Sequence, residues 1–143
     1  MGKISTYFNL EEFIPREIFT QFGEKSIWFV DRGTVLLADF IRDRFGKPMK
    51  INDWHSGGGL NNRGFRTPDC AIGGKLSQHK FKAAIDFNIE GVTPQDIYKD
   101  IIDNQDMYMK AGMTTVEDIA FTATWTHADR RFTGMSKILI VKP

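Results

Sequence analysis

The stretch SQHKFKAAIDF, residues 77–87, places an ionisable carboxylate inside an apolar run that is typical of a β-strand. Alternation along this run puts Ile85 and Phe87 on one face of the predicted strand and Asp86 on the other. A carboxylate on a packed strand costs free energy unless a partner compensates its charge. Either Asp86 therefore faces solvent, or a positively charged group lies against it. His79, at the start of the stretch, is the nearest candidate.

The totals describe an ordinary globular chain of 143 residues, 41% hydrophobic and 26% charged. This length is enough for one domain with one core, so we expect a single domain over residues 1–143. The net charge of +1 gives no field that would attract nucleic acid or an anionic membrane, and neither partner is expected. The single cysteine, Cys70, cannot form an internal disulfide, which favours a reducing compartment.

No apolar run approaches the length of about 18 residues that a transmembrane helix needs. The first 19 residues also lack the long apolar segment of a secretory signal peptide, so we expect no signal peptide.

Apolar periodicity and capping residues predict the remaining elements. We expect helices over 9–23, 31–46 and 92–112, a long loop over 55–78, and strands over 48–54, 83–89, 114–132 and 136–143. Strands gather late in the chain and do not alternate strictly with helices. This order predicts an α+β fold, with a small antiparallel sheet flanked by helices on one side.

A second strand-like run, TATWTHADRR (122–131), carries His127. Two imidazoles and one carboxylate are a typical ligand set for catalytic zinc, which leaves a fourth position for water. A divalent cation would also account for Asp86, because it compensates the buried charge. A plainer interpretation stays open on spacing alone: His79 caps a turn, Asp86 faces solvent, and His127 is a half-buried sheet residue without a metal.

The opening stretch also resembles the S-x-H-x-x-G-x-A-x-D motif of the zinc D-Ala-D-Ala carboxypeptidase-like superfamily. This group includes bacterial and phage peptidoglycan peptidases and, as a fold relative, the Hedgehog signalling domain. Ser77, His79, Ala84 and Asp86 match the motif in type and spacing.

Two further segments carry the resemblance. WTHADRR (125–131) is similar to the second metal segment of the superfamily, and RGFRTP (63–68) resembles an upstream segment whose arginine faces the substrate. The three segments also follow one another in the same order as in the superfamily.

The resemblance implies a Hedgehog/DD-peptidase-like fold, with Zn²⁺ held by His79, Asp86 and His127. It implies that Arg66, with Arg63 as the alternative, binds a substrate carboxylate or carbonyl. The implied activity is that of a metallopeptidase, a D-Ala-D-Ala carboxypeptidase or an endolysin-type endopeptidase. Such a hydrolase cleaves the peptidoglycan stem peptide with a metal-activated water. A phage enzyme of cell wall degradation would be cytoplasmic before release or virion-associated, with phage particle proteins as possible partners.

Two positions depart from the superfamily pattern. Lys82 stands where the motif has glycine, and Thr124 stands three residues before His127, where many relatives have the catalytic acid. Thr124 cannot act as a general base near neutral pH. If residues 116–121 run beside the strand of His127, Glu117 can take that role, while Asp129 is as well placed to orient a ligand. The departure also favours an alternative: a catalytically inactive phage structural or cell-wall-binding module that retains the fold.

Overall fold

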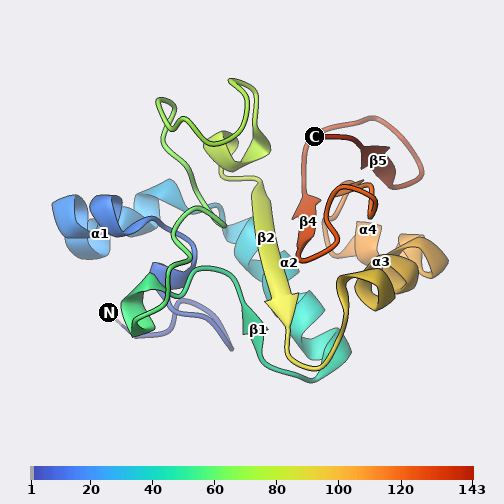
Figure 1. Ribbon diagram of the computed structural model, residues 1–143, viewed down its shortest axis with the longest axis horizontal. Coiled ribbons are helices and arrows are strands. Elements are labelled where there is room, and N and C mark those ends of the chain that lie inside the picture. Colours follow the sequence, from blue (N-terminus) through green and yellow to red (C-terminus); the bar gives the residue numbers. More distant parts are fainter. Residues whose placement is uncertain (1) are drawn as a thin grey trace.

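A computed structural model describes residues 2–143, and its longest strand is the one predicted around Asp86 (Figure 1). The five strands are β1 (Met49–Lys50), β2 (Ala84–Ile89), β3 (Thr115–Glu117), β4 (Thr126–Asp129) and β5 (Leu139–Val141). The α-helices are α1 (Arg16–Phe22), α2 (Arg32–Phe45), α3 (Pro94–Asp103) and α4 (Gln105–Lys110). Short 3-10 helices are η1 (Leu10–Glu12), η2 (Gly23–Phe29), η3 (Trp54–Ser56) and η4 (Gln78–Phe81).

The strands form one sheet in the order β1-β2-β4-β3-β5. All neighbours pair antiparallel except β3 and β5, which are parallel. The chain reverses direction between β3 and β4 and again between β4 and β5. β5 then pairs with the edge of β3 that does not face β4. The α+β prediction is confirmed, but the sheet is mixed where an antiparallel one was expected.

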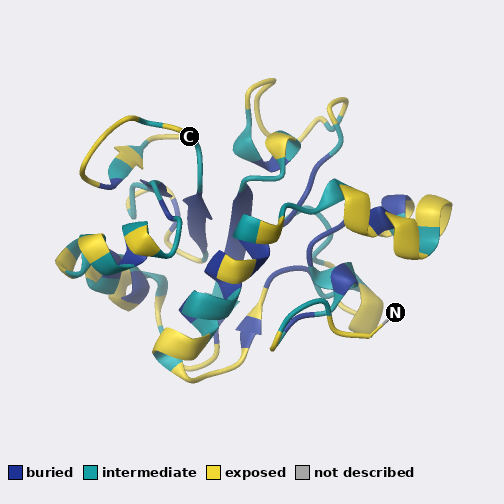
Figure 2. Cartoon of the chain, turned by 180° about the vertical axis from the view of Figure 1, so that it is seen from behind, coloured by how far each residue is buried: buried dark blue, intermediate teal, exposed yellow. Residues whose placement is uncertain are grey.

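One face of the sheet packs on helices. Ile85 and Phe87 of β2 are fully buried, as the alternation predicted, and they belong to one core with Leu37 and Ile41 of α2 and Ile97 of α3. The buried band along the strands is visible from behind in Figure 2. Burial of each such side chain contributes roughly 1.5–3 kcal/mol. The helices thereby fix β2 and leave the Asp86 face of the sheet to other groups.

The best-predicted helix is α2. The Asp31 side chain accepts a hydrogen bond from the Thr34 backbone N–H at its start, and Gly46 ends it in the left-handed region, at φ 63°. The predicted helix over 9–23 is divided instead, because Pro15 precedes α1 as its N-cap. The predicted helix over 92–112 is likewise interrupted at Asn104, between α3 and α4.

Several predicted strands are shorter than expected. The run over 48–54 yields only β1, and the run over 114–132 contains β3 and β4 separated by turns over 118–125. Asp118 accounts for part of this turn, since its carboxylate accepts a hydrogen bond from the Ala120 backbone N–H. Within residues 2–143, none of the helices combines the length and the apolar character needed to cross a bilayer.

Candidate metal centre

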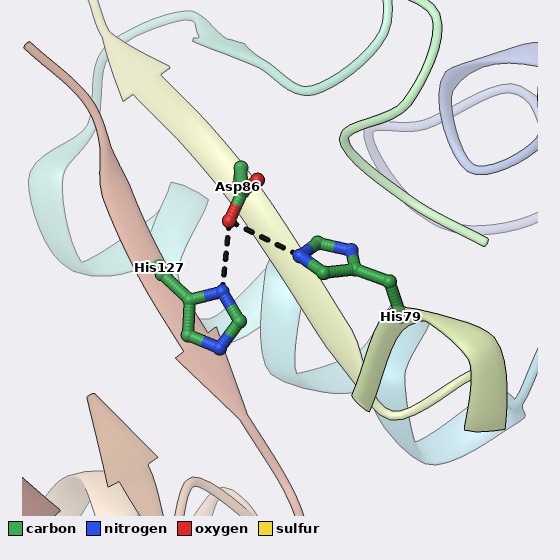
Figure 3. Close-up of side chains that lie close together, drawn as sticks. All are labelled: His79, Asp86 and His127. Atoms are coloured by element: carbon green, nitrogen blue, oxygen red, sulfur yellow. Dashed lines mark hydrogen bonds and ion pairs between the residues drawn. The ribbon is translucent and has the colours of Figure 1, made fainter. Parts of the chain in front are cut away.

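Strand register brings two of the predicted ligands together. Asp86 of β2 lies directly opposite His127 of β4 in the antiparallel ladder. His79 comes from η4, which immediately precedes β2 (Figure 3). The reversal between η4 and β2 depends on Lys82, whose φ of 64° is the left-handed conformation that glycine adopts most easily.

The three predicted ligands converge on one point. Asp86 Oδ1 lies 3.2 Å from His79 Nε2 and 2.9 Å from His127 Nδ1. One ligand atom from each residue falls within 4.8 Å of the other two, and all three side chains are buried. The interpretation in which Asp86 faces solvent is therefore wrong, since only 7% of its surface is exposed.

In each imidazole, both ring nitrogens lie against an acceptor: one against Asp86 and the other against a second oxygen. His79 Nδ1 lies 2.8 Å from the backbone oxygen of Gly64, and His127 Nε2 lies 2.9 Å from Asp129 Oδ2. A neutral imidazole has only one N–H. Each ring therefore either carries a second proton or, with its one N–H donated outward, directs a lone pair toward Asp86. A cation between these lone pairs and the carboxylate satisfies all three groups at once, so the residues present fit a metal ion.

The outer hydrogen bonds also orient the rings. With Nδ1–H of His79 donated to Gly64 and Nε2–H of His127 donated to Asp129, the remaining nitrogens point at Asp86. Partners of this kind commonly fix the tautomer of metal-binding histidines. Asp129 is fully buried, and Arg131 compensates its charge through Nε, 2.9 Å from Oδ1. Asp129 therefore orients the ring of His127.

Electrostatics favour a charged carboxylate at the centre. Burial opposes ionisation of Asp86, but hydrogen bonds from His127 and His79 outweigh it and hold the pKa of Asp86 well below its usual value. Burial likewise opposes protonation of His127, yet bonds to Asp129 and Asp86 raise the pKa of His127 to about 9. In the absence of a metal, a proton on His127 takes the place of a cation.

Arg66 holds the second oxygen of Asp86. One terminal guanidinium nitrogen lies 3.2 Å from Asp86 Oδ2, and Nε donates to the backbone oxygen of Asn62 at 2.7 Å. This leaves Oδ1 of Asp86 for the cation. Arg66 lines the pocket beside the centre, as a substrate-binding arginine would, and that role stays a prediction. Arg63 instead contacts Asn88 and lies outside the pocket lining.

Glu117 reaches the centre from β3. Thr115 and Val116 pair with Asp129 and Ala128, so the next position along β3 falls beside His127. Glu117 Oε1 lies 3.8 Å from His127 Nδ1. Of the predicted residues 116–121, those that belong to β3 do lie beside the strand of His127. The Glu117 carboxylate is therefore next to the three predicted ligands, on the side that faces the pocket. The exposed side chain of Thr124 is absent from the pocket lining.

A pocket of about 550 Å³ opens over the centre. Its walls come from the 73–78 loop, from β3 and β4 and the segments that follow them, and from the chain end after β5, which Figure 1 shows at the same end of the molecule. The lining residues are Arg66, Gly73, Gly74, Leu76, Ser77, Gln78, His79, Asp86, Glu117, Phe121, Trp125, His127, Arg131, Val141, Lys142 and Pro143. The third histidine, His55, is exposed in η3 and takes no part.

Two contributors were not foreseen from the sequence. The Gly64 carbonyl gives no signal, because a backbone oxygen is common to every residue type. Arg131 was not among the predicted site residues, although its alternation with His127 and Asp129 in the predicted strand over 114–132 was a usable signal.

Fold and site together define an α+β protein with a buried His-Asp-His group that could bind a metal ion. The chain matches no protein-family model, no curated protein and no solved structure.

Proposed function

We propose that this chain is a zinc-dependent hydrolase that cleaves a peptide bond of the peptidoglycan stem peptide. The observation that carries the proposal is the buried ligand set itself. His79, Asp86 and His127 converge, and the outer nitrogen of each imidazole is already bonded. Two nitrogens and one oxygen are a donor set that suits zinc.

Peptidoglycan as substrate rests on the resemblance of residues 77–86 and 125–131 to the zinc D-Ala-D-Ala carboxypeptidase-like superfamily. The order and spacing of the ligands support that choice. A lytic enzyme of a phage, cytoplasmic before release or associated with the virion, is the biological setting that we propose with it.

Zinc bound to these residues would activate water as a nucleophile and polarise the scissile carbonyl. Glu117 accepts a proton from the attacking water as the oxygen bonds to the carbonyl carbon, and it delivers that proton to the amine as the C–N bond breaks. Its carboxylate lies on the open side of His127, with 18% of the side chain exposed. Trp125 and Phe121 line the same pocket and supply apolar walls for the peptide.

Metal content is the first test. Purified protein should hold about one zinc per chain, as one mononuclear ligand set predicts. His79→Ala should lose the metal, and His55→Ala, which alters an exposed histidine outside the site, should keep it. Absence of zinc from the correctly folded wild-type protein would refute the proposed site.

Hydrolysis is the second test. Wild-type protein should cleave purified muropeptides, and Glu117→Gln should slow cleavage by about 10²–10⁴-fold while it retains zinc. Glu90→Gln removes an exposed carboxylate at the end of the same sheet and should have no effect. Intact muropeptides together with full zinc occupancy would leave the inactive binding module, which the Thr124 substitution favours, as the remaining function.

A further inference from the structure

The pocket over the metal centre carries more positive than negative side chains. Its charged lining residues are Arg66, Arg131 and Lys142 on one hand and Asp86 and Glu117 on the other. Binding of a divalent cation adds two further positive charges. A pocket of this sign favours an anionic group on its ligand.

Arg66 and Arg131 differ in how many of their guanidinium nitrogens already donate to protein atoms. A guanidinium has five N–H donors. Arg66 is nearly buried, with 10% of its side chain exposed, and each of its three nitrogens already donates to Asn62, Ile72 or Asp86. Arg66 therefore holds the side chain of Asp86, one of the proposed metal ligands, in place.

Arg131 is more available. Among residues 2–143 its side chain bonds only Asp129, through Nε at 2.9 Å and one terminal nitrogen at 2.5 Å. The other terminal nitrogen has no protein partner in the described part of the chain, and 30% of the side chain is exposed at the pocket wall. The bidentate contact with Asp129 holds the guanidinium still, so that little entropy is lost when a ligand binds.

Within the described residues, Glu117 is not an ion-pair partner of Arg131. Among residues 2–143, its carboxylate lies within ion-pair distance of His127 and not of Arg131 or Lys142. Glu117 follows Val116 on β3 and pairs with Val141 of β5, the residue before Lys142. Lys142 therefore follows the β5 residue that pairs with the proposed base, and Arg131 lines the same pocket from the segment after β4.

From these contacts we infer that Arg131, assisted by Lys142, forms a carboxylate-binding subsite in this pocket that determines substrate specificity. The inference rests on the proposed function, and it assigns carboxylate recognition to Arg131, where the sequence had assigned it to Arg66. The carboxylate comes from a free peptide C-terminus or from an acidic side chain of the stem peptide.

Three synthetic stem peptides separate these sources. One has a free C-terminus and neutral side chains, one has an amidated C-terminus and an acidic side chain, and one has neither carboxylate. The zinc-loaded wild-type protein should bind one of the first two at least about tenfold more tightly than the third, as expected for hydrogen bonds to a charged group. Equal dissociation constants for all three peptides would overturn the inference, and this comparison needs no variant.

The assignment to Arg131 is tested by Arg131→Gln, with zinc content measured in parallel. This variant should lose the preference for the carboxylate-bearing peptide and bind it as weakly as the neutral one. Lys75→Gln removes an equal charge from the 73–78 loop without touching the pocket lining, and it should keep the preference. A preference that persists in Arg131→Gln would refute the role of Arg131.

The outcomes distinguish this inference from the proposed function. Binding and hydrolysis are separate readouts, so a protein that binds the carboxylate peptide but hydrolyses none of the three retains the subsite and loses the enzymatic proposal. A protein that hydrolyses all three with equal kcat/KM retains the enzymatic proposal and loses the subsite.

Discussion

Replacement of Asp129 by asparagine tests how far the proposed metal centre depends on a residue that is not itself a proposed metal ligand. Asp129 accepts from His127 Nε2 at 2.9 Å through one oxygen and from Arg131 Nε at 2.9 Å through the other. Asparagine has nearly the same shape, but one of its two terminal atoms is an N–H donor. In either orientation that donor meets an N–H of His127 or of Arg131.

The magnitude follows from this mismatch. Loss of an outer partner of a metal-binding histidine typically weakens metal affinity by about 10–100-fold. At free zinc of about 100 times the wild-type dissociation constant, zinc stabilises the wild type by about 2.7 kcal/mol. The same zinc concentration should stabilise Asp129→Asn by only about 0.4–1.4 kcal/mol. Asp129 is fully buried, and both of its oxygens accept hydrogen bonds. We therefore expect a loss of zinc affinity near the upper end of this range of about 10–100-fold.

Two assays give the result independently. Competition with a zinc-binding fluorescent indicator measures the dissociation constant, and urea unfolding with and without zinc measures the stabilisation. Asp106→Asn, an exposed carboxylate on α4 outside the metal pocket, is the matched control and should leave both values unchanged. A folded Asp129→Asn protein with wild-type zinc affinity would refute the orienting role of Asp129.

Two further predictions concern the fold around the site. Lys82 adopts a φ of 64°, and its Nζ donates to the Trp28 backbone oxygen. Lys82→Gly and Lys82→Ala both lose this bond, but only alanine keeps the backbone strain, so urea unfolding should show the glycine variant to be more stable by about 1 kcal/mol. An alanine variant of equal or greater stability would contradict this. In chelator, the raised pKa of His127, about 9 against an ordinary 6.5, means that stabilisation by its protonated form is complete below about pH 6.5 and is lost as pH rises through about 9. Urea unfolding of the zinc-free protein should therefore show a fall on the order of 3 kcal/mol across that window, and a flat profile would count against the buried His127 pairs.

Much of the site was predictable because its signals are local. The period-two alternation around Asp86 fixed which face of β2 it occupies, and His79 and His127 are the residue types that metal sites use. Glu117 was predictable only conditionally, since its usefulness depended on β3 lying beside β4. The extent of β3 and β4 was not foreseen, because β-branched residues over 118–125 favour a strand while side-chain bonds such as that of Asp118 impose turns.

The sequence by itself determined the α+β class, the limits of α2 and the buried face of β2, because alternation and capping are properties of neighbouring residues. The resemblance of its motifs added the three convergent residues of the candidate site. Tertiary structure alone decided the parallel pairing of β5 with β3, the contact of the Gly64 carbonyl with His79, and the difference in burial and bonding between Arg66 and Arg131. These depend on strand register and on which donors are already bonded, and both are settled only when segments distant in the chain pack together.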